Sequence, residues 1–213
     1  MKRAIGAVCA VIFLSSFALW AQDPIQHSEL SVQVTGVFTS NTNVKNLTSA
    51  TAIKNQIATN SAGVLIGYRI HLTPWEALEV EYGYTQNGQR YYTPATAPGT
   101  GPATYAISST MNDLDANEVV TTPRLFGFFQ PFLLAGGGVV MFSPRGSSLP
   151  GAQRQTEGMF DYGAGLDFHI VNIGARLEFR ELNFKAPYFG LPFLATNKWT
   201  RVASPSVGLI FTF

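Results

Sequence analysis

The feature that most constrains the fold is a period-two alternation of apolar residues with polar residues or glycine. In LEVEYGY (78–84), for example, apolar residues alternate with Glu79, Glu81 and Gly83. Side chains alternate between the two faces of a strand, so such a segment reads as a β-strand with one apolar face. We predict eight strands, at 30–39, 63–72, 77–85, 110–122, 132–142, 159–170, 173–180 and 202–213. Segment 132–142, FLLAGGGVVMF, is apolar or glycine on both faces, so its orientation stays open.

The first 21 residues have the layout of a secretory signal peptide. Lys2 and Arg3 precede a short apolar run, which is followed by small residues. We expect cleavage after Ala21, with Ala18 as the second choice, and a single domain over 22–213. Cleavage leaves 12 basic and 13 acidic residues, a net charge of −1. Cys9 lies in the signal, so the mature chain is expected to have no thiol and no disulfide.

The rest of the sequence has no apolar stretch long enough for a membrane-spanning helix, so an exported membrane protein with these strands must be a barrel. The predicted connections alternate in length. Long ones lie at 40–61, 86–109, 143–156 and 183–200, and short ones at 73–76, 126–129 and 171–172. Long connections on one side and tight turns on the other are typical of outer-membrane barrels. We therefore predict an all-β, eight-stranded, antiparallel up-and-down transmembrane β-barrel.

Two kinds of barrel fit the alternation. A soluble, lipocalin-like ligand binder is apolar inside, whereas a membrane barrel is polar inside. Most strand glycines fall on the polar face, for example Gly67, Gly83 and Gly163. Inside a narrow barrel, glycine leaves room for long charged side chains, which favours a polar interior. We predict a charge network that fills the lumen, formed by Arg69, Glu79, Glu81, Asp161, Asp167, Arg176, Glu178 and Arg180.

The chain resembles the outer membrane protein β-barrel family, the OmpA-like transmembrane barrels, over essentially its whole mature length. The most specific element is its ending, polar–x–Gly–x–x–aromatic–x–Phe, formed by Ser206, Gly208, Phe211 and Phe213. In that family this motif resembles the signal read by the barrel assembly machinery. The segments QPFLLAGGGVVMF and ARLEFRELNFKAP are similar to family strands five and seven. The resemblance implies an outer-membrane location in a Gram-negative-type bacterium. Longer relatives carry a periplasmic domain after the barrel, and we expect none here.

Catalysis is not predicted. Some eight-stranded outer-membrane barrels resemble acyltransferases or lipases with His and Ser at the outer rim. Here His71 and His169 adjoin the short turns, and His27 precedes the first strand. A structural or incidental role is therefore expected for all three. The glycines of AGGGVV do not precede a helix, which excludes a phosphate loop, and Asn46-Leu47-Thr48 is too short a glycosylation signal to carry weight.

Acidic pairs on the strands are open to two interpretations. They are Glu79 with Glu81, Asp113 with Asp115, and Asp161 with Asp167. Such pairs suggest a metal or acid–base site, but alternation alone places carboxylates two residues apart on one face, where they neutralise lumen arginines. We favour the ion-pair network and predict no metal, cofactor or catalytic residue.

The aromatic connection 185–199, KAPYFGLPFLATNKW, also has two interpretations. Either it binds a hydrophobic ligand or partner, or its aromatic side chains belong to the aromatic girdle at the outer membrane interface. We favour the girdle.

Composition and charge narrow the function. Charged residues make up only 13% of the chain and the net charge is +1, so no nucleic-acid partner is indicated. We predict a monomer that is surrounded by lipid and has a plugged polar lumen. Its predicted role is structural or surface-interaction, and its loops are expected to contact a surface partner that the sequence does not name. A narrow outer-membrane channel for small or hydrophobic solutes is the alternative, and a lipocalin-like binder the less favoured one.

Overall fold

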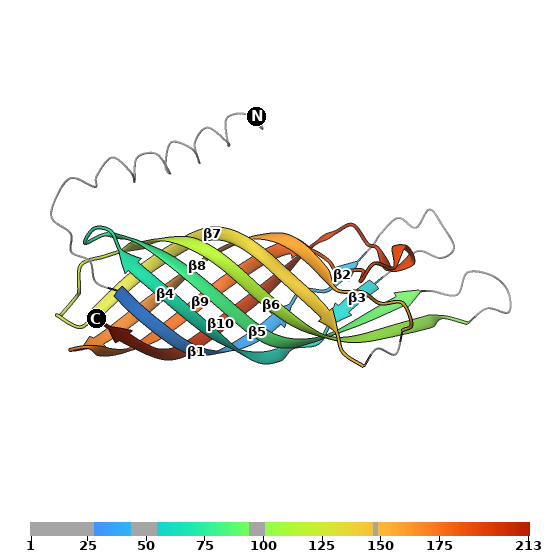
Figure 1. The fold of residues 1–213 in the computed structure, drawn as a ribbon, viewed down its shortest axis with the longest axis horizontal. Helices are drawn as coiled ribbons and strands as arrows, with labels where there is room; N and C mark the ends of the chain where they lie inside the picture. The colour runs from blue at the N-terminus through green and yellow to red at the C-terminus, as the bar shows by residue number, and fades with distance from the viewer. Residues whose placement is uncertain (1–27, 44–54, 94–100, 147–148) are drawn as a thin grey trace, which may run out of the picture.

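The computed structural model describes residues 28–43, 55–93, 101–146 and 149–213. In these residues eight long strands form a closed, tilted barrel (Figure 1). Two short strands, β2 (Thr42–Asn43) and β3 (Asn55–Ala58), extend the sheet beside β5. The long strands are β1 (Ser28–Thr39), β4 (Ser61–His71), β5 (Glu76–Thr93), β6 (Ala103–Thr121), β7 (Phe129–Pro144), β8 (Gln155–Ile170), β9 (Ile173–Lys185) and β10 (Trp199–Thr212).

Every long strand pairs antiparallel with its chain neighbours, and β1 pairs with β10 to close the barrel. At the seam, Ser28 and Phe213 exchange two backbone hydrogen bonds of 3.0 Å. The short connections 72–75, 122–128 and 171–172 lie at one end, which we call the turn end. The connections at the other end, which we call the loop end, are longer.

The side-chain faces follow the alternation. Outward side chains of the central strands are apolar and exposed, such as Val34 (60%) on β1, Val80 (51%) on β5 and Phe179 (50%) on β9. Their polar neighbours along the chain point inward and are buried. A sheet that is apolar outside and polar inside is the reverse of a water-soluble barrel. The predicted fold class, an eight-stranded antiparallel up-and-down transmembrane barrel, is confirmed.

Several predicted boundaries are wrong, most of them at the loop end. Most of the predicted connection 86–109 is a paired hairpin, because β5 continues to Thr93 and β6 begins at Ala103. This hairpin projects beyond the other strands in Figure 1. The predicted loop 40–61 contains β2 and β3, and the turn predicted at 126–129 spans 122–128. Cross-strand pairing extended these strands through polar sequence whose alternation is weak.

The structure also orients β7, which the sequence left open. Phe132, Leu134, Val140 and Phe142 point inward and are buried, whereas Leu133 and Val139 point outward. Gly136 and Gly138 also face inward, where a Cβ atom would collide with the backbone of Ala116 or Leu114 on β6. Gly136 and Gly138 therefore allow a close approach of β6, and Gly137 lies on the outward face beside the backbone of Met159 on β8. Among the described residues, no helix is both long and apolar enough to cross a membrane.

Candidate functional site

The interior of the barrel is the candidate site, because the residues singled out from the sequence meet there. All eight predicted network residues are buried. They come from β4, β5, β8 and β9, which brings side chains that are far apart in sequence into contact across the lumen. From the turn end to the loop end, the interior contains two charged layers and one apolar layer.

The first charged layer is built on Arg69 and Arg176. Arg176 donates to both carboxylate oxygens of Asp167, at 2.8 and 2.9 Å, and to Oε1 of Glu79 at 3.1 Å. Arg69 donates through Nε to the other oxygen of Glu79 and through Nη1 to Asp167 at 3.0 Å. Both guanidinium groups lie over the ring of Phe132, at 4.4 and 5.1 Å from its centroid. These contacts join β4, β5, β7, β8 and β9.

Glu29 completes this layer, and the sequence analysis missed it. Its Oε1 lies 3.2 Å from Nε2 of both His71 and His169, and its Oε2 accepts a hydrogen bond from Arg176 at 3.2 Å. Glu29 is two residues before Ser31 on the inward face of β1, so extending the alternation by one step identifies it. A pocket of about 360 Å³ adjoins the cluster at the turn end and is lined by Glu29, His71, Arg124 and Gln130, among others.

The second charged layer surrounds Arg180 on β9. Five buried carboxylates surround this guanidinium group. Its nitrogens lie 2.7 Å from Glu81, 3.0 Å from Asp115, 3.2 Å from Glu178, 3.8 Å from Asp113 and 3.9 Å from Asp161. Asp113 and Asp115 were recognised in the sequence as an acidic pair, and the fold places them beside an arginine of a distant strand.

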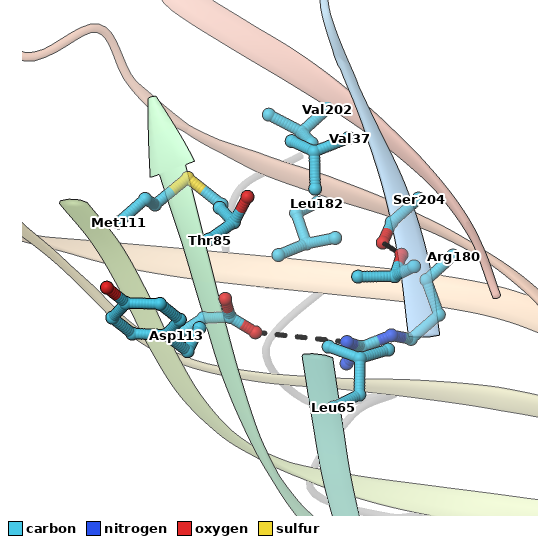
Figure 2. Close-up of a pocket in the computed structure, with 11 residues that line it drawn as sticks. Val37, Leu65, Thr85, Met111, Asp113, Arg180, Leu182, Val202 and Ser204 are labelled. Atoms are coloured by element: carbon cyan, nitrogen blue, oxygen red, sulfur yellow. Dashed lines mark hydrogen bonds and ion pairs between the residues drawn. The ribbon is translucent and has the colours of Figure 1, made fainter. Parts of the chain in front are cut away.

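The third layer, toward the loop end, is apolar and was not predicted. Its buried side chains come from all eight long strands except β4, and from the last connection. They are Val37, Tyr91, Ile107, Met111, Val140, Phe142, Met159, Leu182, Phe184, Phe189, Leu194 and Val202. Figure 2 shows the junction of this layer with the Arg180 layer, where Val37, Leu182 and Val202 face Arg180 and Asp113 across a cavity of about 10 Å³. Such a cavity holds about one water molecule.

The connection 186–198 closes the loop end of the lumen and contains the 3-10 helix η1 (Pro192–Leu194). Phe189 is fully buried and packs edge-on against Phe142. The backbone is held as well, because Gln155 Oε1 accepts hydrogen bonds from the N–H groups of Tyr188 and Phe189, and Tyr91 donates to the carbonyl of Pro187. The girdle interpretation of this connection is therefore wrong for Phe189. It fits Trp199, which is exposed and packs on Phe160.

This capping role predicts a large effect for Phe189→Ala. Removing a fully buried phenylalanine costs about 3–5 kcal/mol in transfer and cavity terms. The urea midpoint of the detergent-folded barrel is expected to fall. Phe193→Ala is the matched control in the same connection, since Phe193 is 45% exposed and its loss should shift the midpoint much less. Equal midpoints for the two variants would contradict a cap seated by Phe189.

The residues of the proposed assembly signal lie along β10. Phe211 and Phe213 point outward, and Phe213 is 6.4 Å from the ring of Tyr68 on β4, centroid to centroid. Ser206 points inward and donates to Oε1 of Gln33 at 2.9 Å. Gly208 faces inward beside the backbone of β1. The expected signal peptide, His27 and the Asn46-Leu47-Thr48 sequence lie outside the described residues.

Two groups of buried side chains have the composition of a cation site. One is Glu29, Asp167 and His169, and the other is Glu79, Glu81 and Glu178. In the first group, both oxygens of Asp167 already accept hydrogen bonds from Arg69 and Arg176, and in the second group both oxygens of Glu79 do the same. The second group lies between the two charged layers, because Glu79 contacts Arg69 and Arg176 while Glu81 and Glu178 contact Arg180.

Comparison with known proteins identifies the fold through structure alone. No family model matches the sequence, and no curated protein matches it. Three similar solved structures are Neisserial surface protein A (14% identity, TM-score 0.55), the attachment invasion locus protein Ail of Yersinia pestis in complex with the heparin analogue sucrose octasulfate (12%, 0.51), and the outer membrane protein OprG from Pseudomonas aeruginosa (12%, 0.50). The matches cover 86%, 88% and 88% of this chain and 97%, 99% and 96% of those chains, respectively. This chain therefore has the fold of the small eight-stranded outer-membrane barrels, as its resemblance to the OmpA-like family predicts.

Proposed function

We propose that this chain is an exported protein that spans the bacterial outer membrane as a monomeric barrel, keeps its lumen closed, and has a structural or surface-interaction role without catalysis. The observation that carries the proposal is the combination of an apolar exterior with a filled interior. An exterior of this kind needs lipid as its partner, and a filled interior does not conduct.

The exterior supports a place in lipid. The apolar face is continuous across the seam, where outward Val32 and Val34 of β1 lie opposite Leu209 and Val207 of β10. Outward aromatic residues lie toward both ends, with Tyr68 and Phe213 near the turn end and Tyr84, Phe160 and Trp199 nearer the loop end. Amphipathic rings at both ends of an apolar band are typical of the two interfaces of a membrane.

The loop end supports a surface role. On β5 the outward side chains change from Tyr82 and Tyr84 to the polar Gln86 and Arg90, while pairing with β6 continues to Thr93. The hairpin thus continues past the apolar band as a hydrogen-bonded sheet, with β3 paired to its edge. A rigid, polar extension beyond the membrane is a suitable surface for a partner, because little conformational entropy is lost on binding.

Planar-bilayer recording tests the closed lumen. We expect the reconstituted full-length protein to give at most rare, low-amplitude openings, because two arginine-centred layers and the apolar layer fill the bore. A porin reconstituted in the same lipid serves as the positive control. Steady openings of porin-like size would overturn the closed-lumen proposal, and failure to partition into detergent would overturn the membrane location.

A narrow channel for small or hydrophobic solutes is the second candidate, and one observation favours it. The loop-end half of the lumen contains a buried apolar layer and is capped by the connection 186–198 rather than by strands. If solutes pass, Phe189→Ala should increase their uptake into proteoliposomes relative to Phe193→Ala. Equal uptake by wild type, both variants and protein-free vesicles rejects the channel.

A further inference from the structure

The buried charges of the lumen do not balance. In the described residues, eight buried carboxylates, those of Glu29, Glu79, Glu81, Asp113, Asp115, Asp161, Asp167 and Glu178, face three buried guanidinium groups. Two buried imidazoles, His71 and His169, are the other titratable groups that face them. Even with both imidazoles protonated, three negative charges remain without a positive partner. An uncompensated charge away from water is strongly destabilising.

The excess is confined to the layer around Arg180. In the first layer, Arg69 and Arg176 with the two histidines face Glu29, Glu79 and Asp167, and the charges are close to balanced. In the second layer, Arg180 alone faces five carboxylates. The apolar layer covers this second layer toward the loop end, so bulk water does not screen the excess from that side.

Several of these carboxylate oxygens also lack a hydrogen-bond donor. Both oxygens of Glu81, Glu178 and Asp161 are buried and have no hydrogen-bond partner among the described residues. One oxygen each of Glu81 and Glu178 makes an ion pair with Arg180, at 2.7 and 3.2 Å, which leaves the second oxygen of each turned to no cation. Buried polar groups of native proteins are nearly always partnered, so such oxygens point to a missing group.

The oxygens are placed as ligands of a single ion would be. One carboxylate oxygen each from Glu79, Glu81 and Glu178 lie within 4.8 Å of one another. Two oxygens that both bind Ca²⁺, at about 2.3–2.6 Å, are at most roughly 5 Å apart. The ligands are all oxygen, the type that Ca²⁺ and Mg²⁺ take. The cavity beside Asp113 and Arg180 leaves room for about one water molecule near this layer.

We propose that the barrel interior binds one hard divalent cation, of the Ca²⁺ or Mg²⁺ type, mainly through Glu81 and Glu178. Glu79 is the third protein ligand and shares an oxygen that also accepts a hydrogen bond from Arg69 or Arg176. The cation supplies positive charge where Arg180 is outnumbered and occupies the oxygens that have no donor. Arg180 pairs with one oxygen of Glu81 and one oxygen of Glu178 and so orients both ligands. The site lies inside the strands and does not depend on whether the loop end meets a surface partner.

The probes are CaCl2 and MgCl2, added separately to the full-length protein refolded in detergent after EDTA treatment. Equilibrium dialysis with elemental analysis measures bound metal, and a urea titration measures stability, with NaCl at matched ionic strength as the reference. We expect about one divalent ion per barrel and a higher urea midpoint than in NaCl. Glu178→Gln should lose the bound ion. Glu181→Gln, three residues later on the outward side of β9, should keep it.

Three results would overturn the proposal. In the first, the wild-type barrel binds no divalent ion and its urea midpoint changes with pH but not with Ca²⁺ or Mg²⁺. This result would mean that protons neutralise the excess negative charge of the carboxylates. The second is the same rise in midpoint with NaCl or KCl. The third is unchanged binding in Glu178→Gln, which places the ion elsewhere. If Glu178→Gln does not fold, Glu81→Gln replaces it, and the wild-type dialysis result stands without either variant. Conductance and detergent partition test the proposed function separately.

Discussion

Arg180→Ala is expected to have the largest effect on stability of any single substitution in the barrel. Arg180 is 1% exposed and, within the described part of the chain, is the one guanidinium group in contact with five carboxylates. Removing one partner of a buried ion pair typically costs about 3–5 kcal/mol, and here five carboxylates lose their guanidinium partner at once. Because a domain is typically stable by about 5–15 kcal/mol, a loss of this size should lower the urea midpoint of the barrel severely.

The measurement is the fraction of heat-modifiable, folded barrel after refolding into detergent over a series of urea concentrations. Arg201→Ala is the matched control, because Arg201 is 69% exposed and lies 3.9 Å from Glu181 on the outward side. An exposed pair of this kind contributes at most about 1 kcal/mol. Similar midpoints for Arg180→Ala and Arg201→Ala would show that the Arg180 layer does not hold the barrel together.

Phe213→Asp is expected to abolish accumulation of the folded protein in the outer membrane of cells, with a much smaller effect on the folded barrel itself. The substitution removes the last aromatic residue of the proposed assembly signal. It retains the two backbone hydrogen bonds to Ser28 that close the seam. Phe213 is near the turn end, and a charge near a membrane interface costs only about 0–1 kcal/mol, compared with about 2–4 kcal/mol for Arg or Lys at the midplane.

Two measurements distinguish a role of Phe213 in the assembly signal from a role in closing the barrel wall. One is the amount of folded protein in outer-membrane fractions, and the other is refolding of the purified protein in detergent without any assembly machinery. We expect a large loss in the first and a small change in the second, with Phe213→Tyr close to wild type in both. Normal amounts of folded Phe213→Asp protein in cells would reject the signal. An equal loss in both assays would assign the role of Phe213 to strand closure.

Strand identity and sidedness could be predicted because they depend on local sequence. Alternation in segments such as 77–85 determines which side chains share a face, and the long stems of Arg69, Arg176 and Arg180 on the polar face indicate which face lies inside. The burial of the eight predicted network residues follows from this periodicity. The same argument could have identified Glu29, which was missed because the predicted strand began at Leu30, whereas β1 begins at Ser28.

The arrangement of the interior could not be predicted, because it depends on register and closure. Alternation says that Asp113 and Arg180 point inward, but the stagger of β5, β6, β8 and β9 around the barrel decides that they meet. For the same reason the sequence suggested compensated charges, whereas the structure gathers five carboxylates at one arginine. The segment FLLAGGGVVMF is apolar or glycine on both faces, so its sequence does not show which face points into the lumen. Pairing with β6 and β8 decides this.

By itself, the sequence of this protein determined eight strands, their polar and apolar faces and the need to close them into a barrel. The strands and faces follow from the alternation of side chains along neighbouring residues. Closure follows because the backbone groups of an open sheet edge would have no hydrogen-bond partner in lipid. Only the tertiary structure decided which carboxylates surround Arg180, that an apolar layer lies in the loop-end half of the lumen, and that Phe189 caps it. These features are contacts between residues that are distant in the chain. Their energies depend on positions across the lumen, which no pattern within a single strand specifies.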